Sequence, residues 1–147
     1  MEASDLASVG PIVDATNMFP SELLPDMAAP YLADPSGPQR WLVHLAGGVM
    51  GVAYYQPEPL TDGTWNLLLI AVQPPAHGQG IGTALMRAVE TDLASRGGRL
   101  LLVETSGKPE FERTRAFYAG LGYQREAVIR DYYAAGDDKV VFAKLIA

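Results

Sequence analysis

A glycine-rich turn between an apolar strand and a helix is the feature that most constrains the fold of this sequence. Glycines stand at alternate positions of the turn, Gly78, Gly80 and Gly82. Before the turn, residues 65–72 form a nearly continuous apolar run, which is typical of a strand covered on both faces. After it, residues 80–96 carry apolar side chains on one stripe at helical spacing. This order of elements predicts a fold of the α/β type.

The same turn predicts an anion-binding site. Glycine permits positive φ and lets the backbone approach a ligand without a Cβ atom in the way. The free N–H groups and the dipole at the start of the following helix favour a phosphate or pyrophosphate. The common nucleotide motifs do not fit, because Thr83 stands where the third glycine of a dinucleotide fingerprint is needed, and no Gly-Lys-Ser/Thr ends the turn.

The rest of the chain alternates between helical and strand periodicity. The predicted elements are two helices between Asp5 and Leu32 separated at Phe19-Pro20, a hairpin of strands 41–45 and 49–55 around Gly47-Gly48, a strand over 100–103, a helix over 110–120, strands over 123–129 and 140–145, and a loop over 131–138. We find no convincing strand before Asp5, so a first strand is either missing or very short. We expect one domain over residues 1–147 with a mixed sheet.

Composition excludes several classes of function. The chain of 147 residues has no cysteine, which excludes disulfides, thiolate zinc sites and a cysteine nucleophile. Its two histidines lack metal-ligand spacing, so we expect no metal. The net charge of −6 argues against nucleic-acid binding, which depends on neutralising phosphates. We expect a cytoplasmic protein without a membrane span or leader. A homodimer through a sheet edge stays an alternative that nothing in the sequence requires.

From about Trp41 onward the sequence resembles the GNAT superfamily of N-acetyltransferases. The family's cofactor motif, Arg/Gln-x-x-Gly-x-Gly/Ala after a strand, is similar to the stretch 77–82, with His77 in place of the first Arg or Gln. The resemblance implies a mainly antiparallel central sheet with helices on both faces, and acetyl-CoA as cofactor. It further implies that a break in the strand near its end frees N–H groups for the thioester carbonyl. The implied cofactor-binding residues are Ile70, Ala71, Val72, His77, Gly78, Gln79, Gly80, Ile81, Gly82 and Thr83.

A second match covers residues 114–123, which are similar to the family helix that ends in Phe-Tyr-x-x-Leu-Gly-Phe/Tyr. The resemblance implies that Tyr118 lies near the thioester sulfur and protonates the departing thiolate. The alternative is that Tyr118 only packs the helix against the sheet. Many relatives have an asparagine seven residues before this tyrosine, where this chain has Phe111.

Glu104 follows the apolar strand at 100–103, where the resemblance places the mouth of the cleft between two diverging strands. An ammonium group must lose a proton before it attacks, and Glu104 is the best-placed carboxylate to accept it. The alternative is a structural ion pair with Arg113 or Arg115. The runs 104–106, 130–133 and 136–138 are similar to one GNAT subgroup. The resemblance to this subgroup makes Asp131, Tyr132 and Tyr133 candidates on the substrate side. The alternative for the two tyrosines is packing of the last hairpin.

The sequence thus predicts an acetyl-CoA-dependent N-acetyltransferase in which a primary amine attacks the thioester directly in a ternary complex. The acceptor is a small molecule or a peptide. Two alternatives stay open, namely acetylation of a protein N-terminus or lysine, and a non-catalytic module that binds acyl-CoA.

Overall fold

A computed structural model describes residues 1–16 and 19–146 of the chain. The α-helices of this part are α1 (Leu6–Asp14), α2 (Leu24–Ala33), α3 (Ile81–Ser95) and α4 (Glu112–Gly120). The strands are β1 (Arg40–Leu45), β2 (Val49–Pro57), β3 (Thr64–Val72), β4 (Leu100–Ser106), β5 (Gln124–Ala134) and β6 (Asp137–Leu145). No strand precedes β1 in the described residues, and the helices of this part are too short or too polar to cross a membrane.

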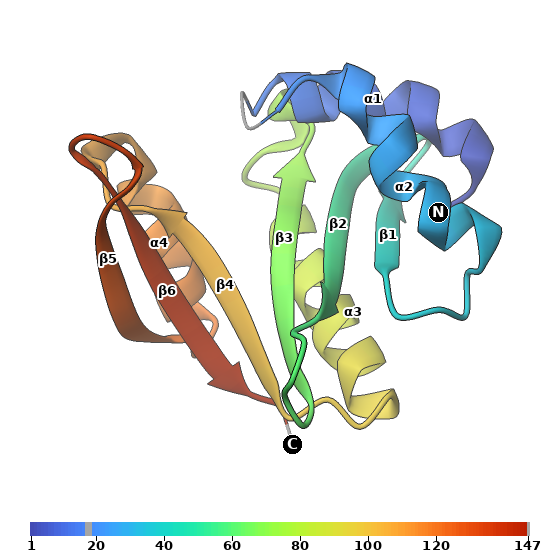
Figure 1. The fold of residues 1–147 in the computed structure, drawn as a ribbon. Helices are drawn as coiled ribbons and strands as arrows, with labels where there is room; N and C mark the ends of the chain where they lie inside the picture. The colour runs from blue at the N-terminus through green and yellow to red at the C-terminus, as the bar shows by residue number, and fades with distance from the viewer. Residues whose placement is uncertain (17–18, 147) are drawn as a thin grey trace.

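The strands form one mixed sheet in the order β1-β2-β3-β4-β6-β5. Only β3 and β4 pair in parallel, and every other neighbouring pair is antiparallel. Helices α1 and α2 lie over one face of the sheet, and α3 and α4 lie over the other (Figure 1). The predicted fold class, a mainly antiparallel mixed sheet with helices on both faces, is confirmed.

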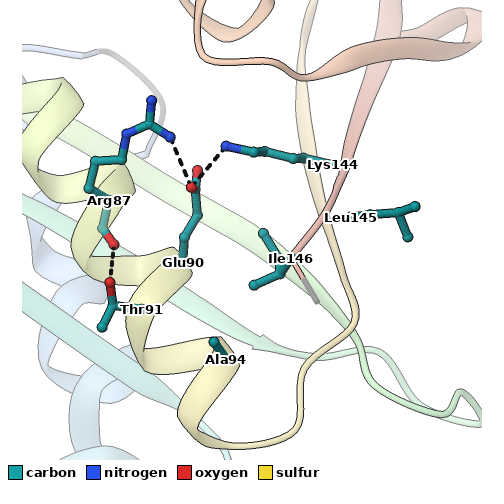
Figure 2. A pocket seen from close by; sticks show the side chains of 7 residues that line it. All are labelled: Arg87, Glu90, Thr91, Ala94, Lys144, Leu145 and Ile146. Atoms are coloured by element: carbon teal, nitrogen blue, oxygen red, sulfur yellow. Dashed lines mark hydrogen bonds and ion pairs between the residues drawn. The ribbon is translucent and has the colours of Figure 1, made fainter.

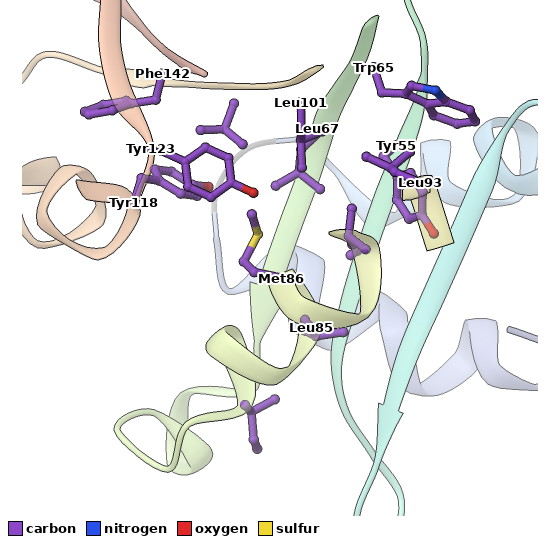
Figure 3. Close-up of a cluster of buried hydrophobic side chains, with 14 of the residues drawn as sticks. Tyr55, Trp65, Leu67, Leu85, Met86, Leu93, Leu101, Tyr118, Tyr123 and Phe142 are labelled. Atoms are coloured by element: carbon purple, nitrogen blue, oxygen red, sulfur yellow. The ribbon is translucent and has the colours of Figure 1, made fainter. Parts of the chain in front are cut away.

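Strand β3 supplies side chains to two hydrophobic cores because alternate residues lie on opposite faces, and an extra residue, Leu68, shifts this alternation by one position. Trp65 and Leu67 belong to the core under α3 and α4, part of which is drawn in Figure 3. Leu69 and Ala71 belong to the core under α1 and α2. The continuous apolar run in the sequence is therefore explained by burial on both sides.

The predicted loop over residues 131–138 is wrong. Strands β5 and β6 run through it and leave a connection of two residues, Ala135-Gly136. Asp131 has a φ of 55° and interrupts the regular register, and its carboxylate accepts a hydrogen bond from the backbone N–H of Gly136 at 2.9 Å. The glycine and aspartates that suggest a loop thus make an irregular hairpin end.

Asp92 of α3 ties the helix to the first two strands. Its Oδ2 accepts a hydrogen bond from the Tyr55 hydroxyl at 2.6 Å and contacts Arg40 Nε at 3.4 Å, and its Oδ1 accepts one from Arg96 Nε at 3.1 Å. Burial acts to raise the pKa of Asp92, but these hydrogen bonds and the two arginine charges outweigh burial and lower it. The carboxylate therefore stabilises the fold when it is ionised.

We expect Asp92→Asn to lower the free energy of unfolding by about 2 kcal/mol at neutral pH, because buried donors lose a charged acceptor. The folded pKa lies below the unfolded value of about 3.9. The difference between wild type and variant is therefore fully present above about pH 4 and disappears as the pH falls through the folded value. Urea unfolding at pH 7 and pH 3 measures both quantities. Asp62→Asn, at an exposed aspartate, is the control, and equal losses in the two variants would contradict the role of Asp92.

Candidate active site

The two central strands separate from each other part-way along the sheet. The pairing of β3 with β4 covers only Thr64–Leu67 against Leu100–Val103. Beyond these residues β3 pairs only with β2, and β4 pairs only with β6. Figure 1 shows the two strands close together near the C-terminus and diverging toward the other end. Beyond Leu67 the edge of β3 that faces β4 is thus left without a strand partner in the described part of the chain.

A β-bulge lies where the strands begin to separate. Tyr54 pairs with Leu69 and Tyr55 with Leu67, so Leu68 is an extra residue on β3. The predicted break in this strand is therefore present, two residues earlier than Ile70. A bulge leaves backbone groups outside the regular ladder, where they can bind a ligand. Leu68 itself is exposed.

The glycine turn has the conformation that an anion site needs. Gly78 and Gly80 have φ values of 79° and 78°, and a Cβ atom on either would find no atom within 4 Å. Gly80 is the N-cap of α3, and its carbonyl accepts the N–H of Ala84. The amides of the first helical turn have no partner within the helix, and the two glycines before them leave open space beside the turn.

Two other residues of the motif have structural roles. A ring nitrogen of His77, Nε2, lies 2.8 Å from the carbonyl oxygen of Val72. Since a carbonyl only accepts, we assign the proton to Nε2, and His77 then fastens the turn to the end of β3. A Cβ atom on Gly82 would lie 3.3 Å from Cζ of Phe117, so this glycine lets α4 approach the start of α3.

The remaining predicted cofactor residues fall into two groups, with exposed and with buried side chains. Gln79 and Thr83 are exposed at the turn. Ile81 and Ala71 are 7% and 5% exposed, with side chains in the two cores, so only their backbones are available to a ligand. Ile70 and Val72 pack against the core under α3.

Tyr118 lies in the aromatic part of the core under α4. Its ring centroid lies 5.4 Å from that of Phe117. The rings of Tyr123 and Phe142, drawn beside it in Figure 3, each have centroids 6.0 Å from that of Tyr118. The residue is 4% exposed, and its hydroxyl donates to no group in the described residues. Burial raises the pKa of Tyr118, so the hydroxyl keeps its proton at neutral pH. Packing and proton donation are both compatible with this position.

Glu104 is the first residue of β4 beyond the last pair with β3. Its Oε1 lies 3.1 Å from Lys139 Nζ and accepts a hydrogen bond from Asn66 Nδ2 at 3.1 Å. Glu104 therefore does form an ion pair, as the alternative to a catalytic role proposed, but its partner is Lys139 rather than Arg113 or Arg115. Arg115 donates to two backbone carbonyls, of Ser106 and Lys108.

The predicted substrate-side residues lie beside this ion pair. The ring of Tyr132 lies under Lys139 Nζ, 4.1 Å from its centroid, and packs edge-on against Tyr133 at 5.1 Å. Burial raises the pKa of Tyr133, and the charge of Glu104 adds to the effect. The carboxylate of Asp131 is engaged in the hairpin end. The two tyrosines therefore lie near Glu104, whereas the Asp131 carboxylate accepts a hydrogen bond within the hairpin end.

Sequence reasoning missed Asn66 and Lys139. One signal was available for Asn66, since it is the only polar side chain inside the apolar run 65–72. A buried amide in such a strand needs partners, which points to a polar cluster. Lys139 had no comparable signal, because it follows Asp137-Asp138 in a segment whose hairpin pairing was not predicted.

A separate surface pocket of about 330 Å³ lies between α3 and the end of β6 (Figure 2). Its charged side chains satisfy one another, since Glu90 Oε1 contacts Arg87 Nη1 at 3.1 Å and Lys144 Nζ at 2.9 Å. None of the residues that line it is among the predicted site residues. The pocket therefore adds nothing to the candidate site.

Comparison with known proteins identifies the family. The acetyltransferase (GNAT) domain family matches residues 37–125, which is more than half of the chain. The chain belongs to the GNAT family of acetyltransferases. GNAT enzymes use acetyl-CoA as acetyl donor and amines as acceptors.

Individual GNAT relatives support the assignment. A putative GNAT acetyltransferase from Desulfovibrio desulfuricans is 33% identical with a TM-score of 0.90, over 99% of this chain and 94% of its own. An uncharacterized N-acetyltransferase of Methanocaldococcus jannaschii is 27% identical over 71% of this chain, and the match spans 64% of that relative. An aminoglycoside 6'-N-acetyltransferase in complex with coenzyme A shares the fold at 19% identity and a TM-score of 0.67, over 86% of this chain and 88% of its own.

Proposed function

We propose that this chain transfers the acetyl group of acetyl-CoA directly to a primary amine within a ternary complex. The observation that carries the proposal is the position of Glu104. This residue follows the last pair between β3 and β4, so it lies at the point where the two strands begin to diverge. On the other side of this opening, β3 continues to the glycine turn. The glycine turn and the carboxylate of Glu104 thus border the same opening between β3 and β4. Transfer of an acetyl group from acetyl-CoA to an ammonium needs both, an anion site for the pyrophosphate and a proton acceptor for the ammonium.

The cofactor would supply an activated acetyl thioester. The amides at the start of α3 would hold its pyrophosphate, and Gly78 and Gly80 leave the necessary space. The backbone N–H groups at the bulge around Leu68 would stabilise negative charge on the carbonyl oxygen as the amine attacks. His77, in place of Arg or Gln, would act by holding the turn rather than by pairing with phosphate.

Two side chains would move protons. Glu104 would accept a proton from the acceptor ammonium, directly or through water, which gives the neutral amine that attacks. As the C–N bond forms and the C–S bond breaks, Tyr118 would give its proton to the thiolate. The attacking nitrogen becomes positively charged and would lose its second proton through water, which returns a proton to the tyrosinate. Tyr132 and Tyr133 would contact the acceptor, because they stand beside Glu104 and are 53% and 46% exposed.

A screen of free amines and peptides with acetyl-CoA tests the proposal through two readouts, release of free thiol and the mass of the acetylated product. We expect turnover with small primary amines, lost in Glu104→Gln. Turnover with peptides alone would replace the small acceptor with a protein one. Tight acetyl-CoA binding without thiol release on any amine, unchanged in Glu104→Gln and Tyr118→Phe, would mean a non-catalytic acyl-CoA-binding module.

A further inference from the structure

The two carboxylate oxygens of Glu104 have different surroundings. Both Asn66 Nδ2 and Lys139 Nζ lie 3.1 Å from the same oxygen, Oε1. No donor in the described part of the chain contacts Oε2, and the Glu104 side chain is 24% exposed. One oxygen is thus anchored and the other is free.

Asn66 is fixed so that it can only donate to this carboxylate. It is 5% exposed, and its Nδ2 also donates to Glu58 Oε1 at 2.9 Å. Its Oδ1 is buried and has no hydrogen-bond partner in the described residues. Turning the amide over would place Oδ1 against two carboxylates, so the observed orientation is the only stable one. Asn66 therefore keeps an unpaired buried oxygen in order to hold Glu104 and Glu58.

Lys139 is the second partner of Glu104 and is also largely buried. Its side chain is 12% exposed, and its ammonium lies over the ring of Tyr132. Burial alone would lower the pKa of Lys139, but the hydrogen bond and charge of Glu104 raise it. The lysine is therefore a permanent cation beside Glu104.

We propose that Asn66 and Lys139 are positioning residues that hold Glu104 Oε1 and leave Oε2 free to take the acceptor's proton. This inference rests on the proposed function. In the step, an N–H bond of the acceptor ammonium breaks and an O–H bond forms at Oε2, which leaves a neutral amine. Without the two anchors the carboxylate would rotate, and its free oxygen would lose its fixed direction.

Two acceptors of the same shape separate this role from a structural one. The first is a primary alkylamine from the amine screen, which is an ammonium at pH 7.5 because its pKa is near 10. The second is its oxyamine counterpart, in which an oxygen replaces the carbon next to nitrogen and the amine is already neutral. Both nitrogens lose a proton after they attack, but only the alkylammonium must lose one beforehand. A defect in the first proton transfer, the one assigned to Glu104, therefore lowers the rate of the alkylamine selectively.

We expect Lys139→Met and Asn66→Ala to lower kcat for the alkylamine by about tenfold or more, with little change in KM. The rate on the oxyamine should stay within about threefold. Lys139→Arg should restore most of the alkylamine rate, because it returns a cation to Glu104. Lys144→Met is the matched control, since it breaks a similar lysine–glutamate pair on the other face of β6 and should leave both rates unchanged. Acetyl-CoA binding by calorimetry shows that each variant is folded.

Equal losses on the two acceptors, or a Lys139→Arg variant no better than Lys139→Met, would overturn the inference. Glu104→Gln separates it from the proposed function. If Glu104→Gln affects the alkylamine selectively and the two anchor variants do not, only the positioning role fails. If Glu104→Gln lowers both rates equally, Glu104 is not the base. If wild type acetylates neither amine, the proposed function is wrong. In either case the positioning role of Asn66 and Lys139 is also rejected.

Discussion

Gly80→Glu should abolish measurable acetyl-CoA binding, with a rise in Kd of at least about a hundredfold. The variant places a carboxylate at the N-cap of α3, where the amides would hold the pyrophosphate. Two unit charges about 4 Å apart at an effective dielectric constant of about 20 repel by about 4 kcal/mol, roughly a thousandfold in affinity. Titration calorimetry with acetyl-CoA and free CoA measures the change, and circular dichroism checks the fold.

Gly97→Glu provides a matched control at the other end of the same helix. Gly97 has a φ of 75°, and a Cβ atom there would also meet nothing within 4 Å. Both variants therefore force a left-handed residue, at a cost of about 1–2 kcal/mol, and both add one negative charge. We expect Gly97→Glu to bind acetyl-CoA within about threefold of wild type. Similar losses in both variants would mean that strain, not the anion site, governs the result.

Tyr118→Phe should lower kcat by about a hundredfold or more and leave the Kd for acetyl-CoA almost unchanged. The variant removes the proposed proton donor and keeps the ring that packs in the core. The hydroxyl of Tyr118 has no hydrogen-bond partner in the described residues, so its removal should cost little stability. Because burial raises the pKa of Tyr118, the wild-type donor stays protonated up to at least about pH 10, and no loss of kcat below that pH should come from it. Steady-state kinetics across pH checks both points.

Tyr123→Phe is the control for this variant. Tyr123 is buried beside Tyr118, with ring centroids 6.0 Å apart, and its hydroxyl donates to Glu90 Oε2 at 2.8 Å. We expect this change to lower the free energy of unfolding by about 1–2 kcal/mol, through the lost charged hydrogen bond, and to leave kcat unchanged. If Tyr118→Phe also keeps full activity, Tyr118 serves packing alone, which is the alternative seen in the sequence.

Most of the fold was predictable because local patterns and tertiary environment agree along this chain. The apolar run of β3 is buried on both faces, and the glycine turn does open α3. The error over residues 131–138 has a physical cause, since the positive φ of Asp131 marks an irregular stretch of β5, beyond which the strand continues and pairs Ala134 with Asp137. Polar residues next to glycine usually indicate a loop, and only the pairing with β6 reveals the exception.

The candidate site was predictable only in part. Glu104 and Tyr118 came from a family resemblance, and their chemical roles stay predictions. Lys139 forms its ion pair with Glu104 from β6, 35 positions later in the chain, and no local sequence pattern predicts this contact. Asn66 was visible as a polar residue in an apolar run, but its partners depend on strand register. Contacts across a sheet follow from pairing, which sequence periodicity alone does not fix.

The short parallel seam between β3 and β4 divides the sheet into two antiparallel halves, β1-β2-β3 and β4-β6-β5. Acetyl-CoA bound between the two strands would contact both halves at once and hold them together. Binding of this kind adds RT ln(1 + [L]/Kd) to the free energy of unfolding, about 2.7 kcal/mol at a hundred times Kd. The stability of the folded protein in a cell would then rise and fall with the acetyl-CoA concentration. A shortage of acetyl-CoA would lower the amount of folded enzyme as well as the amount of its substrate.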